Sequence, residues 1–174
     1  KLFNSSRIIQ VGWSYTENWN GKFNSKNVNA IYRKCKHIKR IDNTFIHGIT
    51  LSTVNKEGML LSKIINKSGF GYALKNTDYI IAHNAGFDVY ILLNELYRIN
   101  YGKRINSIMN LLKKGNVICT LKYARGICTG RRNLAAFYEH YYNEVPKILH
   151  RADEDVKVLL DILNKLVYDA KIKN

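Results

Sequence analysis

The order of apolar and polar residues predicts two extended stretches near the start of the chain. Residues 7–15, RIIQVGWSY, are rich in β-forming residues. A turn at Asn20-Gly21 separates them from a second extended stretch that runs toward Ile31 and Tyr32. Because Asn-Gly favours tight turns, this arrangement predicts a β-hairpin.

Apolar residues then recur at helical spacing from Leu51 to Leu74, where glycines at 69 and 71 interrupt the pattern. A short apolar run at residues 79–82 predicts a buried strand, and another brief strand is predicted at residues 117–119. Helical pieces are expected around residues 134–142. After a loop at Pro146, a final helix is expected from about Ala152 to Tyr168.

The segment after the strand at 79–82 is predicted to be an amphipathic helix that carries Asp88 in its first turn. Asn84 is a candidate N-cap for this helix. Its apolar positions recur three or four residues apart, at Phe87, Ile91, Leu92, Leu96 and Ile99. A lone carboxylate between two apolar runs needs a partner, a capping role or a metal ion. Which of the three applies decides the function.

A hairpin followed by alternating strands and helices predicts the α/β class, with a mixed β-sheet flanked by helices. The chain has 174 residues, of which 46% are hydrophobic. This size and composition suit one globular domain over residues 1–174 with a sizeable core.

The net charge of the chain indicates what kind of partner it binds. Twenty-eight lysines and arginines against thirteen acids give a net charge of +15, which attracts polyanions and above all nucleic acid. An AT-rich genome would also raise the lysine content, so charge alone decides nothing. Residues 96–138 contain nine basic residues and no acid, whereas residues 139–169 contain seven of the thirteen acids. A second basic cluster, RKCKHIKR, covers residues 33–40.

Three cysteines without a C-x-x-C pair indicate neither a disulfide framework nor a cysteine-type zinc site. No apolar run reaches the roughly 18 residues that a membrane span requires, and the first twenty residues contain no signal-peptide core. We therefore expect a soluble intracellular, cytoplasmic protein with reduced thiols.

The final helix offers a second carboxylate. Asp155 lies at the edge of its apolar stripe, while Asp161 is expected on the opposite face, paired with Lys157 or Lys165. The simplest interpretation of Asp155 is that it is an acid in the first turn, which interacts favourably with the helix dipole. His150, five residues upstream, changes the balance because a histidine with an ordinary pKa near ~6.5 can accept a proton from water. Two carboxylates that hold divalent cations, beside such a histidine, favour phosphodiester hydrolysis.

Five segments follow one another along the chain: RIIQVGWSY, IHGIT at 46–50, HNAGFD at 83–88, ICT at 118–120 with Ala124-Arg125, and H-x4-D at 150–155. In this order they resemble the DEDDh group of 3′-to-5′ exonucleases. The group includes the DnaQ-like proofreading subunits of DNA polymerase III (epsilon) and oligoribonuclease, and it has a ribonuclease H-like fold. Five weak motifs in the right order over nearly the whole chain make chance agreement improbable.

The resemblance implies roles for particular residues. Asp88 and Asp155 would be acids of the second and third exonuclease motifs and would bind two divalent cations, Mg²⁺ or Mn²⁺. His150 would be the general base that deprotonates the attacking water. Arg151 stands where the sister subgroup has a tyrosine, which favours the histidine subgroup.

The remaining implied residues contact substrate. Asn84 and Phe87 would position the nucleotide, and His47, Gly48 and Ile49 would line the pocket of the terminal nucleotide. Other roles remain open: Phe87 as core, His47 as a turn residue and His83 as a structural hydrogen-bonding histidine. Arg131 and Arg132, in the basic stretch, are expected to bind the phosphates of the strand.

The chain departs from the family in one respect. The first motif, Asp-x-Glu on the central strand, is not found, because the first acid is Glu17. Since a domain without its central strand would expose unpaired edges, we expect the native protein to start upstream of Lys1.

Two functions follow. The first is a metal-dependent exonuclease that releases nucleoside monophosphates from the 3′ end of single-stranded DNA or RNA, alone or in proofreading beside a DNA polymerase. The second is a catalytically inactive nucleic-acid-binding module, to which the missing motif and the +15 charge point. The sequence leaves the oligomeric state open.

Overall fold

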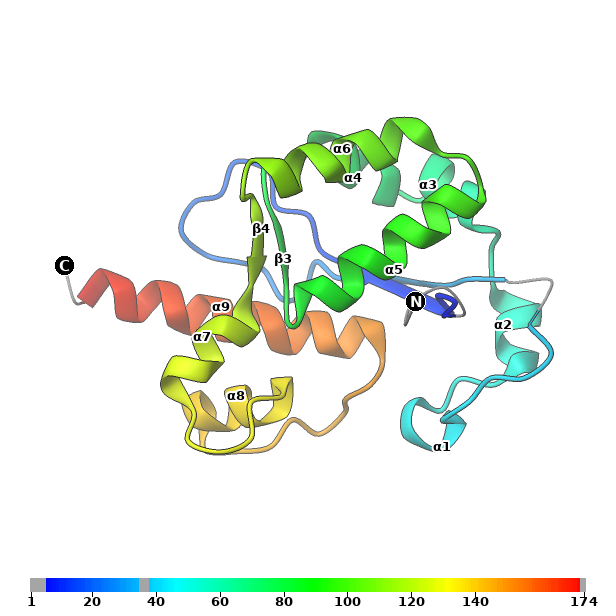
Figure 1. Ribbon diagram of the computed structural model, residues 1–174. Coiled ribbons are helices and arrows are strands. Elements are labelled where there is room, and N and C mark those ends of the chain that lie inside the picture. Colours follow the sequence, from blue (N-terminus) through cyan, green and yellow to red (C-terminus); the bar gives the residue numbers. More distant parts are fainter. Residues whose placement is uncertain (1–5, 35–37, 173–174) are drawn as a thin grey trace. The chain divides into compact units, whose positions relative to one another are not determined.

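A computed structural model describes residues 6–34 and 38–172, in which helices and short strands alternate (Figure 1). The strands are β1 (Gln10–Trp13), β2 (Asn29–Tyr32), β3 (Ile80–Ala82) and β4 (Val117–Cys119). The helices are α1 (Thr44–His47), α2 (Leu51–Glu57), α3 (Leu61–Lys67), α4 (Phe70–Asn76), α5 (Ala85–Arg98), α6 (Gly102–Lys113), α7 (Thr120–Ile127), α8 (Leu134–Tyr142) and α9 (Ala152–Ile172). Lys1–Phe3 and residues 35–37 of the second basic cluster lie outside the described residues.

The chain forms two compact units. The first comprises Lys1–Val11 and Ile31–Thr120, and the second comprises Gly12–Ala30 and Leu121–Asn174. Strands β1 and β2 pair as a two-stranded sheet, and β3 and β4 form a second one. The predicted hairpin is confirmed only in this pairing, because the long segment 14–28 joins β1 to β2 in place of a tight turn at Asn20-Gly21. The described elements are therefore a mixed α/β arrangement with small sheets, consistent with a ribonuclease H-like fold.

The parallel pair β3–β4 organises the first unit. Ile80 aligns with Val117, and Ala82 aligns with Cys119. Parallel strands need a long crossover, which α5 and α6 supply. Both strands end at the same edge of the sheet, so the residues that follow Ala82 and Cys119 meet there. Ligands bind at such edges in α/β proteins.

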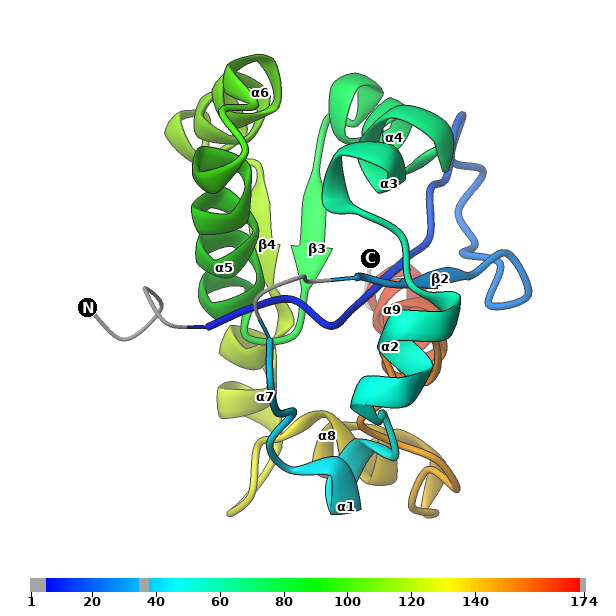
Figure 2. The same cartoon turned by 90° about the vertical axis from the view of Figure 1, so that its right-hand side faces the viewer.

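Helix α5 packs on both strands and on α6, and α3 packs on α4. Figure 2 shows α5 and α6 on one side of the β3–β4 pair and α3 and α4 on the other. The side chains of Ile64, Leu96 and Ile108 are completely buried and form part of the core. Burial of such apolar area drives folding of this unit.

One charged network lies inside this core. Glu95 on α5 is completely buried, and its carboxylate lies 2.6 Å from Arg33 Nη2 and 3.1 Å from Arg98 Nη1. The same two arginines donate to the backbone carbonyl oxygens of Ile8 and Ser6, respectively. The network therefore fastens the chain before β1 to α5.

In the second unit, α8 packs against α9. Its core contains Ala124, Phe137, Val158 and Ile162, from α7, α8 and α9. Gly12 in β1 lies against the start of α9, because a Cβ built at Gly12 would be 2.3 Å from the carbonyl oxygen of Ala152. This close approach holds the beginning of α9 against β1.

The structure corrects two parts of the predicted pattern. Residues 51–76 form three separate helices, because the chain leaves helical geometry at Gly58 before it breaks again near Gly69. Helices α6 and α7 were not predicted. The former buries Ile105, Ile108 and Leu111 at a spacing of three, a pattern that sequence inspection could have found.

Candidate functional site

The start of α5 presents three of the predicted site residues. Asn84 precedes the helix with a left-handed backbone (φ 67°), and its carbonyl oxygen accepts a hydrogen bond from the Phe87 amide at 2.8 Å. Asn84 thus occupies the predicted N-cap position, although its side chain forms no capping hydrogen bond. Phe87 is 50% exposed and is not a core residue.

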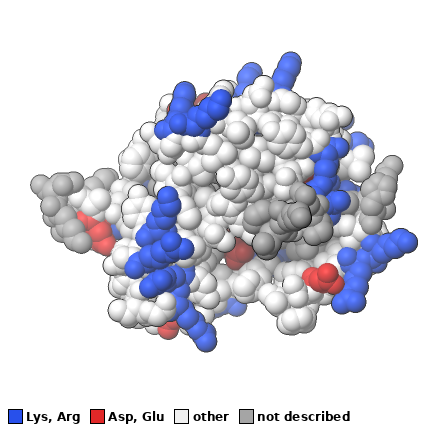
Figure 3. Space-filling model, viewed as in Figure 1, with Lys and Arg blue, Asp and Glu red and all other residues white. Residues whose placement is uncertain are grey.

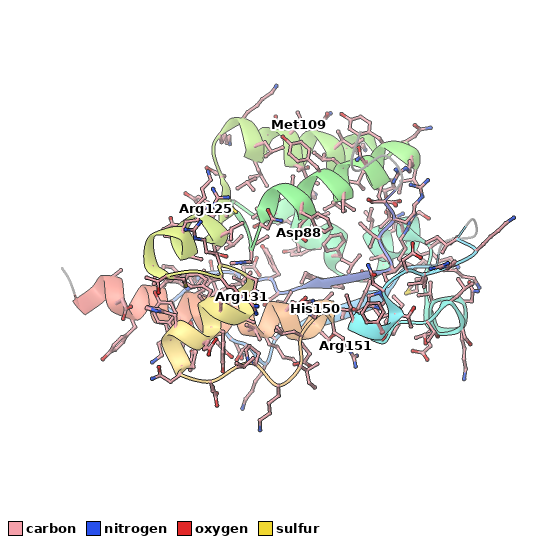
Figure 4. All side chains as sticks on the ribbon, turned by 60° about the horizontal axis from the view of Figure 1, so that its bottom comes forward. Asp88, Met109, Arg125, Arg131, His150 and Arg151 are labelled. Atoms are coloured by element: carbon pink, nitrogen blue, oxygen red, sulfur yellow. The ribbon has the colours of Figure 1, made fainter. Side chains whose placement is uncertain are left out.

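Asp88 lies in the first turn of α5 and is exposed (Figure 4). Asp88 lies at the surface because residues 87 and 88 face away from the helix side that packs on the sheet. The partial positive charge of a helix N-terminus stabilises a carboxylate at this position. Because Asp88 is exposed and lies shortly after the end of β3, its carboxylate is also accessible to a cation or a substrate.

The adjacent His83 has a structural role, as one of the sequence readings expected. Its Nδ1 lies 3.0 Å from the Thr120 hydroxyl, and Thr120 is completely buried. Since His83 follows β3 and Thr120 follows β4, this contact ties the two strand ends together.

The IHGIT segment forms a tight local structure around α1. The Ile49 amide donates to Nδ1 of His47 at 3.0 Å, so Nε2 carries the ring proton and donates to the Asp42 carbonyl oxygen at 3.0 Å. Gly48 has a positive φ of 69°, and Ile49 is only 4% exposed. The imidazole is thus fixed as a turn residue, and any part in a nucleotide pocket stays a prediction for these three residues.

Sequence inspection missed an exposed aromatic residue beside His47. Phe45 on α1 is 88% exposed, and its neighbour Ile46 is 45% exposed. An exposed aromatic ring offers a face on which a nucleotide base can stack. The signal was available in the sequence, because Phe45 immediately precedes the IHGIT segment.

In the second unit, Asp155 lies in the first turn of α9 and is half-buried. Its Oδ1 accepts a hydrogen bond from the backbone amide of His150 at 3.0 Å. Partial burial raises the pKa of Asp155, and the hydrogen bond and charge of His150 partly oppose this shift. His150 itself is exposed and has a left-handed backbone, with φ 66°.

The other two acids of this turn are paired with cations. Asp153 lies 3.5 Å from Arg151 Nε, and Glu154 lies 2.8 Å from Lys157 Nζ. Within residues 6–34 and 38–172, no lysine or arginine forms an ion pair with Asp155. Asp155 therefore differs from Asp153 and Glu154 in having no paired lysine or arginine in these ranges, although the helix dipole stabilises all three carboxylates.

Basic side chains form a surface strip on the second unit (Figure 3). The strip, hereafter the basic strip, consists of the exposed residues Lys122, Arg125, Arg131 and Arg132. Lys122 and Arg125 lie three residues apart on α7, and the arginine pair lies on the segment that joins α7 to α8. Figure 4 labels Arg125 and Arg131 on these two segments. Such a strip attracts the phosphates of a nucleic acid.

The family assignment comes from a family model for exonucleases of the RNase T type, which matches residues 5–163. The chain belongs to the exonuclease family. A search of curated proteins finds no match. This exonuclease is accordingly a nuclease of the hydrolase class that acts on nucleic acids, and the family generally uses divalent metal ions.

The metal ligands of this exonuclease are the least complete part of the site. In the part of the chain that the structure describes, no three His, Cys, Asp or Glu side chains gather in a group that could hold a metal ion. Asp88 and Asp155 have the oxygen ligands that Mg²⁺ and Mn²⁺ prefer. Asp88 belongs to the first unit and Asp155 to the second. Their joint role in a metal site stays a prediction.

Asp161 differs from its expected role as an exposed partner of lysine. It is half-buried, and burial raises its pKa, while the nearby Ser25 acts in the opposite direction. Lys157 pairs with Glu154, while Lys165 Nζ lies 5.4 Å from the centre of the Tyr142 ring. The helical wheel failed here because residues 14–28 cover this part of α9.

None of the helices in the described ranges is long and apolar enough to cross a membrane.

Proposed function

We propose that this exonuclease is a DEDDh-type enzyme that hydrolyses single-stranded DNA or RNA from the 3′ end and releases nucleoside monophosphates. The observation that supports the proposal above others is the state of Asp155. Its carboxylate is held by the His150 amide and forms no ion pair with lysine or arginine among the described residues, whereas both neighbouring acids are paired. A carboxylate kept clear of lysine and arginine is suited to bind a cation.

Asp88 and Asp155 would hold the divalent ions, whose chemistry is to lower the pKa of bound water and to neutralise phosphate charge. His150 would accept the proton of the attacking water through its exposed imidazole. The hydrogen bond from its backbone amide to Asp155 leaves both ring nitrogens available for this role. Arg151 stands where the sister subgroup has its tyrosine, and it pairs with Asp153. No tyrosine at this position can therefore act as in that subgroup.

The substrate would contact residues of several elements. Asn84 and Phe87 would position the nucleotide beside Asp88, and His47, Gly48 and Ile49 would form the terminal pocket. Phe45 would add a stacking surface there, since it is 88% exposed. Arg131 and Arg132, together with Lys122 and Arg125, would hold strand phosphates.

The whole chain would act as one exonuclease domain, either alone or as the proofreading partner of a DNA polymerase. The alternative is an inactive nucleic-acid-binding module, which the basic strip and the net charge of +15 favour. The two functions differ in hydrolysis and not in binding, so an activity measurement separates them.

The test follows a single strand labelled at its 5′ end or its 3′ end, incubated with the full gene product in Mg²⁺, Mn²⁺ or EDTA. We expect metal-dependent release of labelled monophosphate from the 3′-labelled strand, and progressive shortening of the 5′-labelled strand. Asp88→Asn and Asp155→Asn should each abolish the reaction. Asp161→Asn, a half-buried aspartate of the same helix α9, is the matched control and should retain it.

Tight binding without hydrolysis in either metal would refute the enzyme and support the inactive module. Equal loss of activity in Asp161→Asn would show that α9 tolerates no change of charge, and the specific role of Asp155 would then be refuted.

A further inference from the structure

Residues 14–28, which join β1 to β2, form an irregular segment that is fastened to α9. The amide of Phe23 donates to Asn164 Oδ1 at 2.7 Å, and Asn164 Nδ2 donates to the Phe23 carbonyl oxygen at 2.9 Å. Ser25 lies close enough to Asp161, one turn earlier on α9, to lower the pKa of its carboxyl group against the larger rise that burial causes. Within the segment, the Ser14 hydroxyl donates to the Asn27 carbonyl oxygen at 2.8 Å. A connection held at these points has a defined conformation.

The fastened segment displays a tryptophan. Trp19 is 51% exposed, and its ring stacks on Phe23, with ring centroids 5.6 Å apart and an interplanar angle of 29°. Phe23 is the residue whose backbone Asn164 holds on both sides. The indole is therefore presented to solvent on a fixed support, which lowers the entropy cost of binding a ligand to it.

The surroundings of Trp19 favour a nucleic acid over a protein surface as its ligand. The core of a protein interface is apolar, whereas Trp19 is the one large hydrophobic residue of the 14–28 segment that is strongly exposed. Along the segment, the exposed residues near Trp19 are Lys22 and Lys26, which complement phosphate, one acid, Glu17, and several asparagines. Proteins bind single strands through exposed aromatic rings combined with basic side chains.

We propose that Trp19, supported by Phe23 and followed along the segment by Lys22 and Lys26, is a base-stacking site for single-stranded nucleic acid. The site lies outside the carboxylates and the histidine assigned to hydrolysis. It deepens the proposed function, on which it rests for the substrate class, by giving the strand an additional contact. A stacked base with its phosphate beside a lysine would hold the strand without regard to sequence, since every base has a π-face.

Intrinsic fluorescence tests this site directly. The chain contains two tryptophans, of which Trp13 is 9% exposed and Trp19 is 51% exposed. The difference in emission between wild type and Trp19→Phe therefore reports Trp19. We expect a short oligothymidylate or oligouridylate, titrated in EDTA, to quench this emission saturably, and a blunt DNA duplex to quench it much less.

Trp19→Ala should weaken binding of the same oligonucleotide about five- to tenfold in fluorescence anisotropy, as loss of a stacked base predicts. Tyr168→Ala, which removes a similarly exposed ring on α9, is the matched control and should leave the affinity for the oligonucleotide unchanged. Asn164→Ala should lower the anisotropy of Trp19 emission and weaken binding by a smaller factor. Lys22→Glu with Lys26→Glu should weaken binding and flatten its salt dependence.

Absence of Trp19 quenching at low salt, or unchanged binding by Trp19→Ala, would overturn the proposal and leave a protein partner as the ligand of the indole. Equal quenching by single strand and duplex would also overturn it, because phosphate contacts alone would then explain binding. The measurement is made in EDTA, so it is independent of hydrolysis. If hydrolysis is normal but Trp19 emission is not quenched, only the stacking site is refuted. If Trp19 emission is quenched but no hydrolysis occurs, only the proposed enzymatic function is refuted.

Discussion

The backbone amide of His150 donates a hydrogen bond to Oδ1 of Asp155 at 3.0 Å. The contact requires the left-handed backbone of His150, with φ 66°, because the chain must turn back toward the helix that it is about to enter. One residue thus orients the carboxylate through its main chain and leaves its imidazole exposed. The two roles can be separated by mutation.

His150→Asn should abolish most hydrolysis and retain the fold. Asparagine adopts a left-handed backbone more readily than alanine, so the amide contact to Asp155 should survive. Loss of a general base costs about 10²- to 10⁴-fold in rate. Single-turnover kinetics with a labelled strand measures this, and His140→Asn, at the exposed histidine of α8, is the control. Near-normal rates in His150→Asn would remove the imidazole from the mechanism.

Reversal of charge in the basic strip should affect binding more than chemistry. Arg131→Glu combined with Arg132→Glu removes two phosphate contacts, so the slope of log K against log salt should fall by about 0.7 for each contact to a single strand. Binding is measured in EDTA over a salt series, and the catalytic rate at saturating substrate. Lys147→Glu, an exposed lysine in the same unit outside the strip, is the control. A lower saturating rate with unchanged affinity would contradict the assignment.

The buried network of the first unit should dominate the stability of that unit. Glu95→Ala leaves Arg33 buried without its counter-charge, which costs about 3–5 kcal/mol in the free energy of unfolding. Asp42→Asn breaks the exposed pair between Arg40 and Asp42 and should cost about 1 kcal/mol or less. Urea unfolding measures both. Similar losses in the two variants would mean that the buried pair contributes no more than an exposed one.

Asp161 should make stability depend on pH. Burial raises its pKa above the ordinary value near 3.8, so the folded state binds the proton more tightly than the unfolded state does. Wild type should therefore lose stability relative to Asp161→Asn as the pH rises from about 3.8 through the folded pKa, and the difference should be constant above that range. Urea unfolding from acid to neutral pH measures the difference. A difference that is independent of pH, or that changes in the opposite direction, would show that burial does not control this group.

Local patterns of apolar, polar and turn residues predicted several elements at the correct residues. Strand β4 and helix α8 lie at the predicted residues, and α9 starts at Ala152 as expected. The run of β-forming residues also identified β1 and its pairing with β2, although the connection between them is longer than the predicted turn. In these cases the residue types along one short segment favour its conformation, so the sequence contains the necessary information.

Contacts between distant segments could not be predicted in this way. Asp161 and Asn164 look like solvent-facing residues on a helical wheel, yet the 14–28 segment covers them. The exposure of Asp88 depends on which side of α5 faces the sheet. The distinction among Asp153, Glu154 and Asp155 required the positions of individual cations. Each of these facts depends on packing partners far along the chain or on side-chain geometry.

The contacts made by Arg33 and Arg98 with the chain before β1 limit how this protein can be shortened for laboratory use. Arg98 Nη1 lies 3.0 Å from the carbonyl oxygen of Ser6, and Arg33 Nη1 lies 3.3 Å from that of Ile8. A protease cut or a deletion beyond these residues would take away acceptors from two guanidinium groups. Affinity-tag junctions and cleavage sites therefore belong ahead of Ser6.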